Sequence, residues 1–294
     1  MSELATLAQP VAVVCHDAGA ANIVLAQMLA APDVFYLPVM QGPALKIFTD
    51  SGFYASALLS LDEALTGARS VVTGTGWASN LEHDARSRAK ALSLHNVAVI
   101  DHWVNYAARF ERSGQLVLPD EVWVTDAYAF GIASNTFMGM KIRQCANRYL
   151  DRQVQKIAPV SNLVQHQVLY VLEPLRFSWP GCKQSGEFEA LDFFANSLGK
   201  ISTGHELKIR LRPHPSDAPD KYRNWLAKNQ GHDILMDDSS GLSEAIGRAE
   251  WVAGCETAAM VLALAARRKV LCTLPPDAPW CRLPHAGIVH LRDL

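Results

Sequence analysis

The stretch from Trp251 to Leu274 constrains the fold of this chain more than any other. The apolar run WVAG leads through CET into the helical segment AAMVLALAA, and a second apolar run, VLCTL, follows the basic residues RRK. Apolar runs separated by a helix are typical of a βαβ unit, which belongs to a parallel sheet covered by helices. A helix this apolar must be buried, and its amino end then lies at the sheet edge where ligands bind.

The same alternation recurs on both sides of residues 147–167, a stretch without a clean core strand. Before it, we expect strands at Val11–Cys15, Val34–Val39, Ser70–Thr73, Val97–Ile100 and Glu121–Val124. After it, we expect strands at Val168–Leu172, Leu207–Arg212, Asp233–Met236, Trp251–Gly254 and Val270–Leu274. The predicted fold class is therefore α/β, with two doubly wound, Rossmann-like parallel-sheet domains at residues 1–158 and 159–294.

Composition excludes several classes of function. The 27 basic and 29 acidic side chains give a net charge of −2, which leaves no electrostatic footprint for nucleic acid. No run approaches the roughly 20 apolar residues of a membrane span, although peripheral membrane contact stays open. The six cysteines lack CxxC spacing, which indicates reduced thiols rather than disulfides or a zinc site. With no signal peptide in the sequence, we expect a cytoplasmic protein.

Polar residues follow two expected strands of the first half. The first strand leads into the turn HDAGAAN and then a helix. This strand–turn–helix arrangement leaves backbone N–H groups free to bind a phosphate. Gly19 and the alanines equally suit close packing of the helix on the strand. Asp17 is either a functional carboxylate or a helix cap. The strand ending at Ile100 runs into Asp101 and His102, a carboxylate and a titratable ring placed where side chains project into a ligand cleft.

The helix that follows the segment GTGW supplies another carboxylate. Ser79 is its expected N-cap, and Glu82, three residues on, is the expected capping-box partner. Glu82 is also a candidate catalytic group. We interpret Asp84, Arg86 and Arg88 as a solvated face that complements the helix dipole.

A corner stiffened by proline ends the strand Leu207–Arg212. Arg212-Pro213 and His214-Pro215 are successive X-Pro steps, which hold the turn extended and remove backbone donors. An arginine and a histidine on a rigid turn at the carboxyl end of a strand can hold an anion. The alternative for His214 is a plain turn residue.

Further polar residues end other strands of the second half. They are Glu173, the N-cap candidates Ser239 and Ser240, and the helix-start residues Glu256 and Thr257. Two helix starts together with an arginine and a histidine predict a site for a phosphate diester or diphosphate. A carboxylate opposes phosphate, so Glu256 is expected to bind ribose hydroxyls of a nucleotide, unless it only completes the helix start.

The second half resembles the donor domain of bacterial sialyl-, polysialyl- and Kdo-type transferases. The shared features are a His-Pro pair after a core strand, here His214-Pro215, and a hydroxyl residue at a helix start, here Ser239-Ser240 or Thr257. These enzymes are GT-B glycosyltransferases, whose relatives include sugar-nucleotide 2-epimerases and polyol-phosphate polymerases. The resemblance covers roughly residues 168–276 and is topological over the first half. The small acidic–acidic–glycine motif of some of these families is not evident here.

The resemblance implies two domains facing across a cleft, with an acceptor-side domain at 1–158 and a nucleotide-sugar donor domain at 159–294. The expected enzyme is an inverting, metal-independent glycosyltransferase of surface polysaccharide biosynthesis. It would move a nonulosonic, sialic- or Kdo-like acid from a CMP donor to a glycan, lipid-linked saccharide or protein hydroxyl, without a cofactor. The expected nucleotide-binding residues are Glu173, Arg212, His214, Pro215, Ser239, Ser240, Glu256 and Thr257. The candidates for the group that takes the acceptor proton are Asp17, Asp101, His102 and Glu82.

Other functions stay open on the same residues. UDP-sugars and CDP-polyols are alternative ligands, and a sugar-nucleotide epimerase, a hydrolase or a CDP-polyol phosphotransferase would use the same fold. A nucleotide-binding protein without catalytic activity is a candidate from another class. The sequence does not identify the sugar, the acceptor or the oligomeric state.

Overall fold

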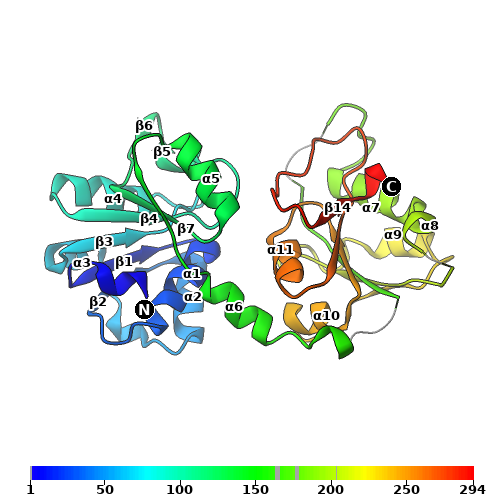
Figure 1. The fold of residues 1–294 in the computed structure, drawn as a ribbon, viewed down its shortest axis with the longest axis horizontal. Coiled ribbons are helices and arrows are strands. Elements are labelled where there is room, and N and C mark those ends of the chain that lie inside the picture. Colours follow the sequence, from blue (N-terminus) through cyan, green and yellow to red (C-terminus); the bar gives the residue numbers. More distant parts are fainter. Residues whose placement is uncertain (1, 163–165, 176–178, 203) are drawn as a thin grey trace. The chain divides into compact units, whose positions relative to one another are not determined.

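A computed structural model describes residues 2–162, 166–175, 179–202 and 204–294. The chain forms two compact units, Met1–Tyr149 and Leu150–Leu294, each built on its own sheet (Figure 1). The division lies within helix α6 (Arg148–Gln155), whereas the sequence places the boundary at Ala158. None of the described helices combines the length and apolar character that crossing a membrane requires.

Unit 1 is organised around a six-stranded parallel sheet of order β2-β1-β3-β4-β7-β8. The strands are β1 (Val11–Cys15), β2 (Tyr36–Met40), β3 (Ser70–Thr73), β4 (His95–Val99), β7 (Glu121–Val124) and β8 (Lys141–Gln144). The helices are α1 (Ala18–Leu29), α2 (Gly42–Asp50), α3 (Leu61–Gly67), α4 (Leu81–Ala91) and α5 (Ala127–Thr136). Short 3₁₀ turns occupy Glu3–Thr6, Ala55–Ala57 and Ala107–Phe110, and a hairpin joins β5 (Glu111–Arg112) to β6 (Gln115–Leu116).

The two faces of the unit 1 sheet bury different helices, as the period-two geometry of a strand requires. Val11 and Val13 of β1 join the core formed with α1 and α2, whereas Ala12 and Val14 join the core formed with α3 and α4. Every residue of β1 is buried, which explains why this strand is a continuous apolar run. The chain leaves β1 for β2 on one side and returns to β3 on the other, so the topological switch point lies between β1 and β3.

Unit 2 has a second six-stranded parallel sheet, of order β11-β10-β9-β12-β13-β14. Its strands are β9 (Gln167–Val171), β10 (Lys208–Arg212), β11 (Ile234–Met236), β12 (Trp251–Gly254), β13 (Lys269–Cys272) and β14 (Ile288–His290). Its helices are α7 (Gly186–Asn196), α8 (Leu198–Ile201), α9 (Arg223–Lys228), α10 (Leu242–Arg248) and α11 (Ala258–Ala265), with 3₁₀ turns at Val160–Asn162 and Leu291–Asp293. Here the strand order reverses between β9 and β12, which is the switch point of a Rossmann sheet.

The predicted fold class, with its two doubly wound parallel sheets, is confirmed. The sequence missed β8 and β14, each at one edge of its sheet, although it found β2 and β11 at the opposite edges. β8 lacks the continuous apolar run that identifies a buried strand. All four residues of β8 (KIRQ) are partly or fully exposed.

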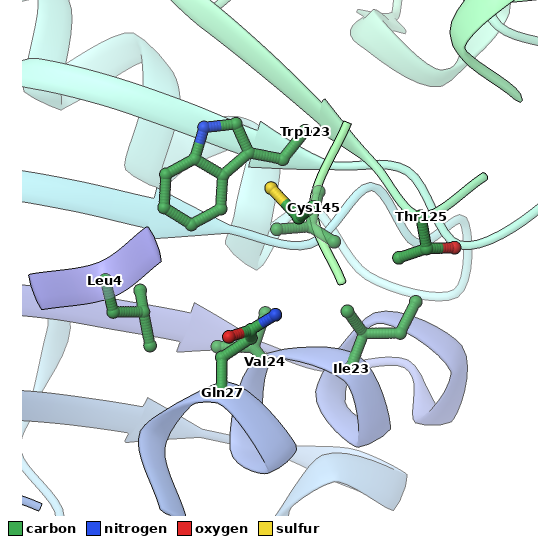
Figure 2. A pocket seen from close by; sticks show the side chains of 8 residues that line it. Leu4, Ile23, Val24, Gln27, Trp123, Thr125 and Cys145 are labelled. Carbon is green, nitrogen blue, oxygen red and sulfur yellow. The ribbon is translucent and has the colours of Figure 1, made fainter. Parts of the chain in front are cut away.

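A small cavity lies beneath α1 in the core of unit 1 (Figure 2). Its volume is about 10 Å³, close to the space that one water needs. The polar side chains Gln27 and Thr125 that line it are already hydrogen-bonded. Gln27 accepts from Ser2 Oγ and donates to the carbonyl oxygen of Ala146, and Thr125 Oγ1 accepts from Asn147 Nδ2. We therefore regard this cavity as a packing void.

Candidate functional site

The switch point of unit 1 holds a histidine–aspartate pair directly after β1. His16 Nδ1 lies 2.7 Å from Asp17 Oδ1, and the second carboxylate oxygen accepts the backbone N–H of Trp77 at 2.8 Å. Because a carboxylate only accepts hydrogen bonds, Nδ1 is the donor in this pair. Nε2 faces Gly42, the first residue of α2, on which a Cβ would lie 2.5 Å from it. The two side chains are 18% and 27% exposed, so solvent and small molecules can reach them.

Asp17 occupies the N-cap position of α1, but its side chain does not cap the helix. The capping alternative for Asp17 is therefore wrong, because the carboxylate bonds to His16 and to Trp77 instead. This frees Asp17 for the functional role that the sequence also suggests.

Glu82 of α4 is the most buried carboxylate of this edge, at 1% exposed. It accepts the backbone N–H of His16 at 3.0 Å and that of Gly76, and so ties the loop after β1 to the loop after β3. Burial raises the pKa of Glu82, against the lowering effect of these hydrogen bonds. The expected capping box is wrong: Asn80 is the N-cap, and Ser79 Oγ accepts only the N–H of Leu81.

Three glycines make room for the three carboxylates of this edge. A Cβ on Gly76 would lie 2.2 Å from Asp17 Oδ2, and one on Gly74 would lie 2.3 Å from Glu82 Oε1. A Cβ on Gly19 would lie 1.6 Å from Asp101 Oδ2. Gly19 is therefore a close-packing position, as one of the two sequence interpretations held, but the group packed on it is a carboxylate.

Asp101 follows β4 and is held by an arginine. Its Oδ1 accepts from Arg109 Nη1 at 2.9 Å, and the same guanidinium donates to Thr75 Oγ1 at 3.1 Å. Asp101 thus lies beside the loop after β3, on the strand next to the switch point. The ring of His102, the neighbouring candidate, lies 5.3 Å from the ring of Trp103.

Arg86 departs from its expected place on a solvated helix face. It is 1% exposed and donates to Thr73 Oγ1 at 3.1 Å and to the carbonyl oxygen of Gly74 at 2.8 Å. Burial lowers its pKa to about 10. Asp84 and Arg88 do lie on the exposed face, as predicted. The sequence pattern could not separate Arg86 from them because its burial depends on the loop after β3.

In unit 2, the switch point brings Glu173 and Glu256 together. Glu173 Oε1 accepts the backbone N–H of Glu256 at 2.5 Å. A carboxylate therefore already occupies a backbone donor just before α11. Burial raises the pKa of Glu173 to about 7. Thr257 is the N-cap of α11, as expected, with its hydroxyl accepting the N–H of Ala259.

Glu256 itself is neutralised by an arginine. Its carboxylate accepts from Arg282 Nε at 2.9 and 3.1 Å and from the backbone N–H of Arg282 at 3.2 Å. The ion pair raises the pKa of Arg282. The ribose-binding role of Glu256 remains a prediction. A ribose hydroxyl that binds Glu256 would share its carboxylate with Arg282.

The proline corner lies after β10, the strand next to β9. Arg212 Nη1 donates to Asp237 Oδ2 at 2.5 Å and to the carbonyl oxygen of Ser239 at 3.4 Å, which links the corner to the segment after β11. His214 is exposed, with Nδ1 2.7 Å from Ser216 Oγ, and Pro215 is exposed beside it. Sheet order therefore brings the four predicted contributors to adjacent strands, β11, β10, β9 and β12.

The N-cap role of Ser239 and Ser240 is wrong. Gly241 is the N-cap of α10, Ser240 Oγ donates to Glu244, and Ser239 Oγ donates to Asp237 at 2.8 Å. Ser240 lines a hollow of about 480 Å³ with Lys156 and Arg248, among others. Nearby carboxylates outcompete the backbone for both hydroxyl groups.

Two residues of these edges were missed by sequence reasoning. His16 was visible beside Asp17 in the motif HDAGAAN, and the adjacency of an imidazole and a carboxylate was a usable signal. Arg282 gave no signal, because it meets Glu256 only through the fold. In the described part of the chain, no group of three His, Cys, Asp or Glu is arranged to hold a metal.

No protein-family model and no curated protein matches the chain in sequence. Solved structures match it in fold. A putative UDP-N-acetylglucosamine 2-epimerase from Listeria monocytogenes is 12% identical with a TM-score of 0.62, over 90% of this chain and 79% of that one. The UDP-GlcNAc 2-epimerase from Neisseria meningitidis bound to UDP-GlcNAc is 10% identical with a TM-score of 0.58, over 93% and 84%. The S. aureus MnaA–UDP structure is 12% identical with a TM-score of 0.56, over 89% and 78%. At such identities the likeness is one of fold, and the fold is GT-B.

Proposed function

We propose that this chain is a sugar-nucleotide enzyme that transfers the sugar to a hydroxyl group with inversion and without a metal. His16 would take the proton from the acceptor hydroxyl as that oxygen attacks the anomeric carbon and the bond to the nucleotide phosphate breaks. The observation that carries the proposal is the His16–Asp17 pair. A carboxylate that holds Nδ1 leaves Nε2 as the ring atom that could accept a proton, which is the arrangement that orients a histidine as a general base.

Asp17 orients His16 in this proposal, and Glu82 holds the two loops on which they depend. Glu82 accepts the backbone N–H of His16, so it fixes the position of the His16 backbone. This role does not require Glu82 to contact the substrate. Asp101 is less suited to act as the base, because Arg109 already occupies one of its carboxylate oxygens.

Unit 2 would bind the nucleotide and stabilise the leaving phosphate. Arg212 and Arg282 are cationic groups near the carboxyl ends of its strands, and each is already held in place by a carboxylate. Fixed cations stabilise negative charge that develops on a leaving group without reorganising at the moment of reaction. A diphosphate or phosphate diester is the anion that these groups suit.

The donor nucleotide can be a cytidine or a uridine nucleotide. The resemblance of the His214-Pro215 corner favours a CMP-linked acidic sugar, whereas solved structures of similar fold are named as bound to UDP or to UDP-GlcNAc. The neighbours also favour a second function, epimerisation of a UDP-sugar, since several are named UDP-GlcNAc 2-epimerases. Epimerisation would use His16 to remove or return a proton on the sugar itself.

Proton NMR of reaction mixtures tests the proposal. The full chain is incubated with CMP-sialic acid or UDP-GlcNAc, each with and without a set of sugar acceptors. A new glycosidic signal that requires the acceptor supports transfer, and a changed sugar configuration in the intact nucleotide sugar without acceptor supports epimerisation. If His16→Gln turns over as fast as the parent chain, His16 is not the base and the proposal fails.

A further inference from the structure

Trp77 is an exposed aromatic residue directly beside the proposed base. Its side chain is 49% exposed, although the three residues before it in the loop after β3, Gly74, Thr75 and Gly76, are all buried. Its backbone N–H donates to Asp17 Oδ2 at 2.8 Å, so Trp77 and the His16–Asp17 pair are anchored to each other. A large aromatic face kept open on a rigid loop is suited to stacking against the apolar face of a sugar ring.

Two arginines flank this indole. The guanidinium carbon of Arg112 lies 5.3 Å from the ring centroid and that of Arg109 lies 6.0 Å away, both within the range of a cation–π contact. Arg109 is neutralised, because it pairs with Asp101. Arg112 instead donates to two carbonyl oxygens, those of Glu111 and Gly76.

Arg112 is therefore held by backbone carbonyl oxygens rather than by a carboxylate. Its Nε, which is buried, has no hydrogen-bond partner within the described ranges. The position of Arg112 is fixed by the β5–β6 hairpin, whose turn uses Ser113 and Gly114 at positive φ. His83 of α4 also lies against the hairpin, with Nε2 3.2 Å from the carbonyl oxygen of Gln115.

We propose that Trp77 and Arg112 form an acceptor subsite for an anionic sugar. The sugar ring stacks on Trp77, and its carboxylate or phosphate pairs with the guanidinium of Arg112. The hydroxyl to be glycosylated then lies toward the His16–Asp17 pair, to which Trp77 is bonded. This inference rests on the proposed function and adds the class of the acceptor to it.

The chain offers a matched control in unit 2. Trp280 is 62% exposed and has the guanidinium carbon of Arg292 4.9 Å from its ring centroid. Arg292 donates to three backbone carbonyl oxygens, and the ring also meets His290 edge-on. Trp280→Ala therefore removes an exposed tryptophan with an arginine over it, in the unit that does not contain the proposed base.

Saturation-transfer NMR and titration with the full chain test the subsite. The probes are the methyl glycoside of N-acetylneuraminic acid, which carries a carboxylate, glucose 6-phosphate, and neutral methyl glucoside. We expect at least one anionic probe to bind, with its Kd raised about tenfold or more by Trp77→Ala and by Arg112→Gln. Trp77→Phe keeps an aromatic face and should restore most of the binding, and Trp280→Ala should leave the Kd unchanged.

The two anionic probes distinguish a carboxylate from a phosphate, because the probe that binds identifies which acidic group the subsite accepts. Binding of neither anionic probe, equal binding of the neutral sugar, or an equal loss in Trp280→Ala overturns the inference. Thermal unfolding of each variant identifies any that fails to fold, and for such a variant Trp77→Phe and the probe comparison still decide. Loss of turnover in His16→Gln with no probe binding at Trp77 would refute the subsite and leave the proposed function standing.

Discussion

The carboxyl edges of the two sheets hold their charged groups in different ways on similar architecture. In unit 1, Asp17 and Glu82 bond to backbone N–H groups, and glycines make room for them. In unit 2, Arg212 and Arg282 are each tied to a carboxylate, and Glu173 takes up the segment leading into α11. Unit 1 therefore presents a histidine held by a carboxylate, whereas unit 2 presents arginines that are each paired with a carboxylate.

The difference shows that the doubly wound sheet supplies only the place for a site. Its switch point brings the residues after two strands together in both units. The chemistry depends on which residues follow those strands. In unit 1 the carboxylates and the backbone hold each other, so single glycines become essential. In unit 2 charge pairs hold the site, and it should tolerate changes in the backbone better.

Gly19→Ala should have the largest effect on stability. The new methyl group would overlap Asp101 Oδ2, and Asp101 is held by Arg109, so neither group can yield easily. We expect a loss of about 3 kcal/mol in the free energy of unfolding, measured by urea denaturation. Gly131→Ala is the control: it lies in α5 with open space around its Cα, and should gain roughly 0.5–1 kcal/mol. Equal effects at the two positions would mean that the carboxylates do not constrain the unit 1 edge.

Glu82→Ala should follow, with a loss of about 2 kcal/mol. It leaves the N–H groups of His16 and Gly76 without their acceptor in a buried site. Glu63→Ala is the matched control, because Glu63 also accepts a backbone N–H but lies in an exposed capping box, where the loss should be about 1 kcal/mol or less. Urea denaturation of both variants checks this order, and a smaller loss for Glu82→Ala would refute the buried clamp.

The pH dependence of stability should reveal Glu173. Its pKa is raised in the folded chain to about 7, so the folded state binds more protons than the unfolded state between the ordinary pKa and about 7. Its contribution to stability is therefore present at low pH and is lost as the pH rises through that window. The substituted side chain of the Glu173→Gln variant cannot ionise. The difference in free energy of unfolding between this variant and the parent chain should therefore favour the variant more at pH 8 than at pH 5, by about 1 kcal/mol or more. Parallel pH profiles of the two proteins would show that burial does not govern this carboxyl.

The sequence predicted the central strands best. β1, β3, β7 and β12 begin and end at the expected residues, because strands buried on both faces are continuous apolar runs bounded by polar turns. β8 and β14 are mostly unburied and lack that signal, so they were missed.

Side-chain roles were harder to predict because they depend on partners that are distant in the sequence. Glu82 fitted a local capping box, yet it bonds to His16 across 66 positions of the chain. Arg86 fitted an exposed helix face, yet the loop after β3 buries it. Thr257 was expected at a helix start, and that local placement holds because its cap partner, Ala259, is two residues away; its nucleotide-binding role stays a prediction.

The most direct test separates substrate binding from turnover at the His16–Asp17 pair. Turnover of the nucleotide sugar and the thermal shift caused by the nucleotide are measured for the parent chain, His16→Gln, and the control His95→Gln at the opposite edge of the same sheet. We expect His16→Gln to lose roughly 10²- to 10⁴-fold in kcat with the thermal shift unchanged, and His95→Gln to match the parent. Undiminished turnover in His16→Gln, or no thermal shift with any cytidine or uridine nucleotide, would contradict the account.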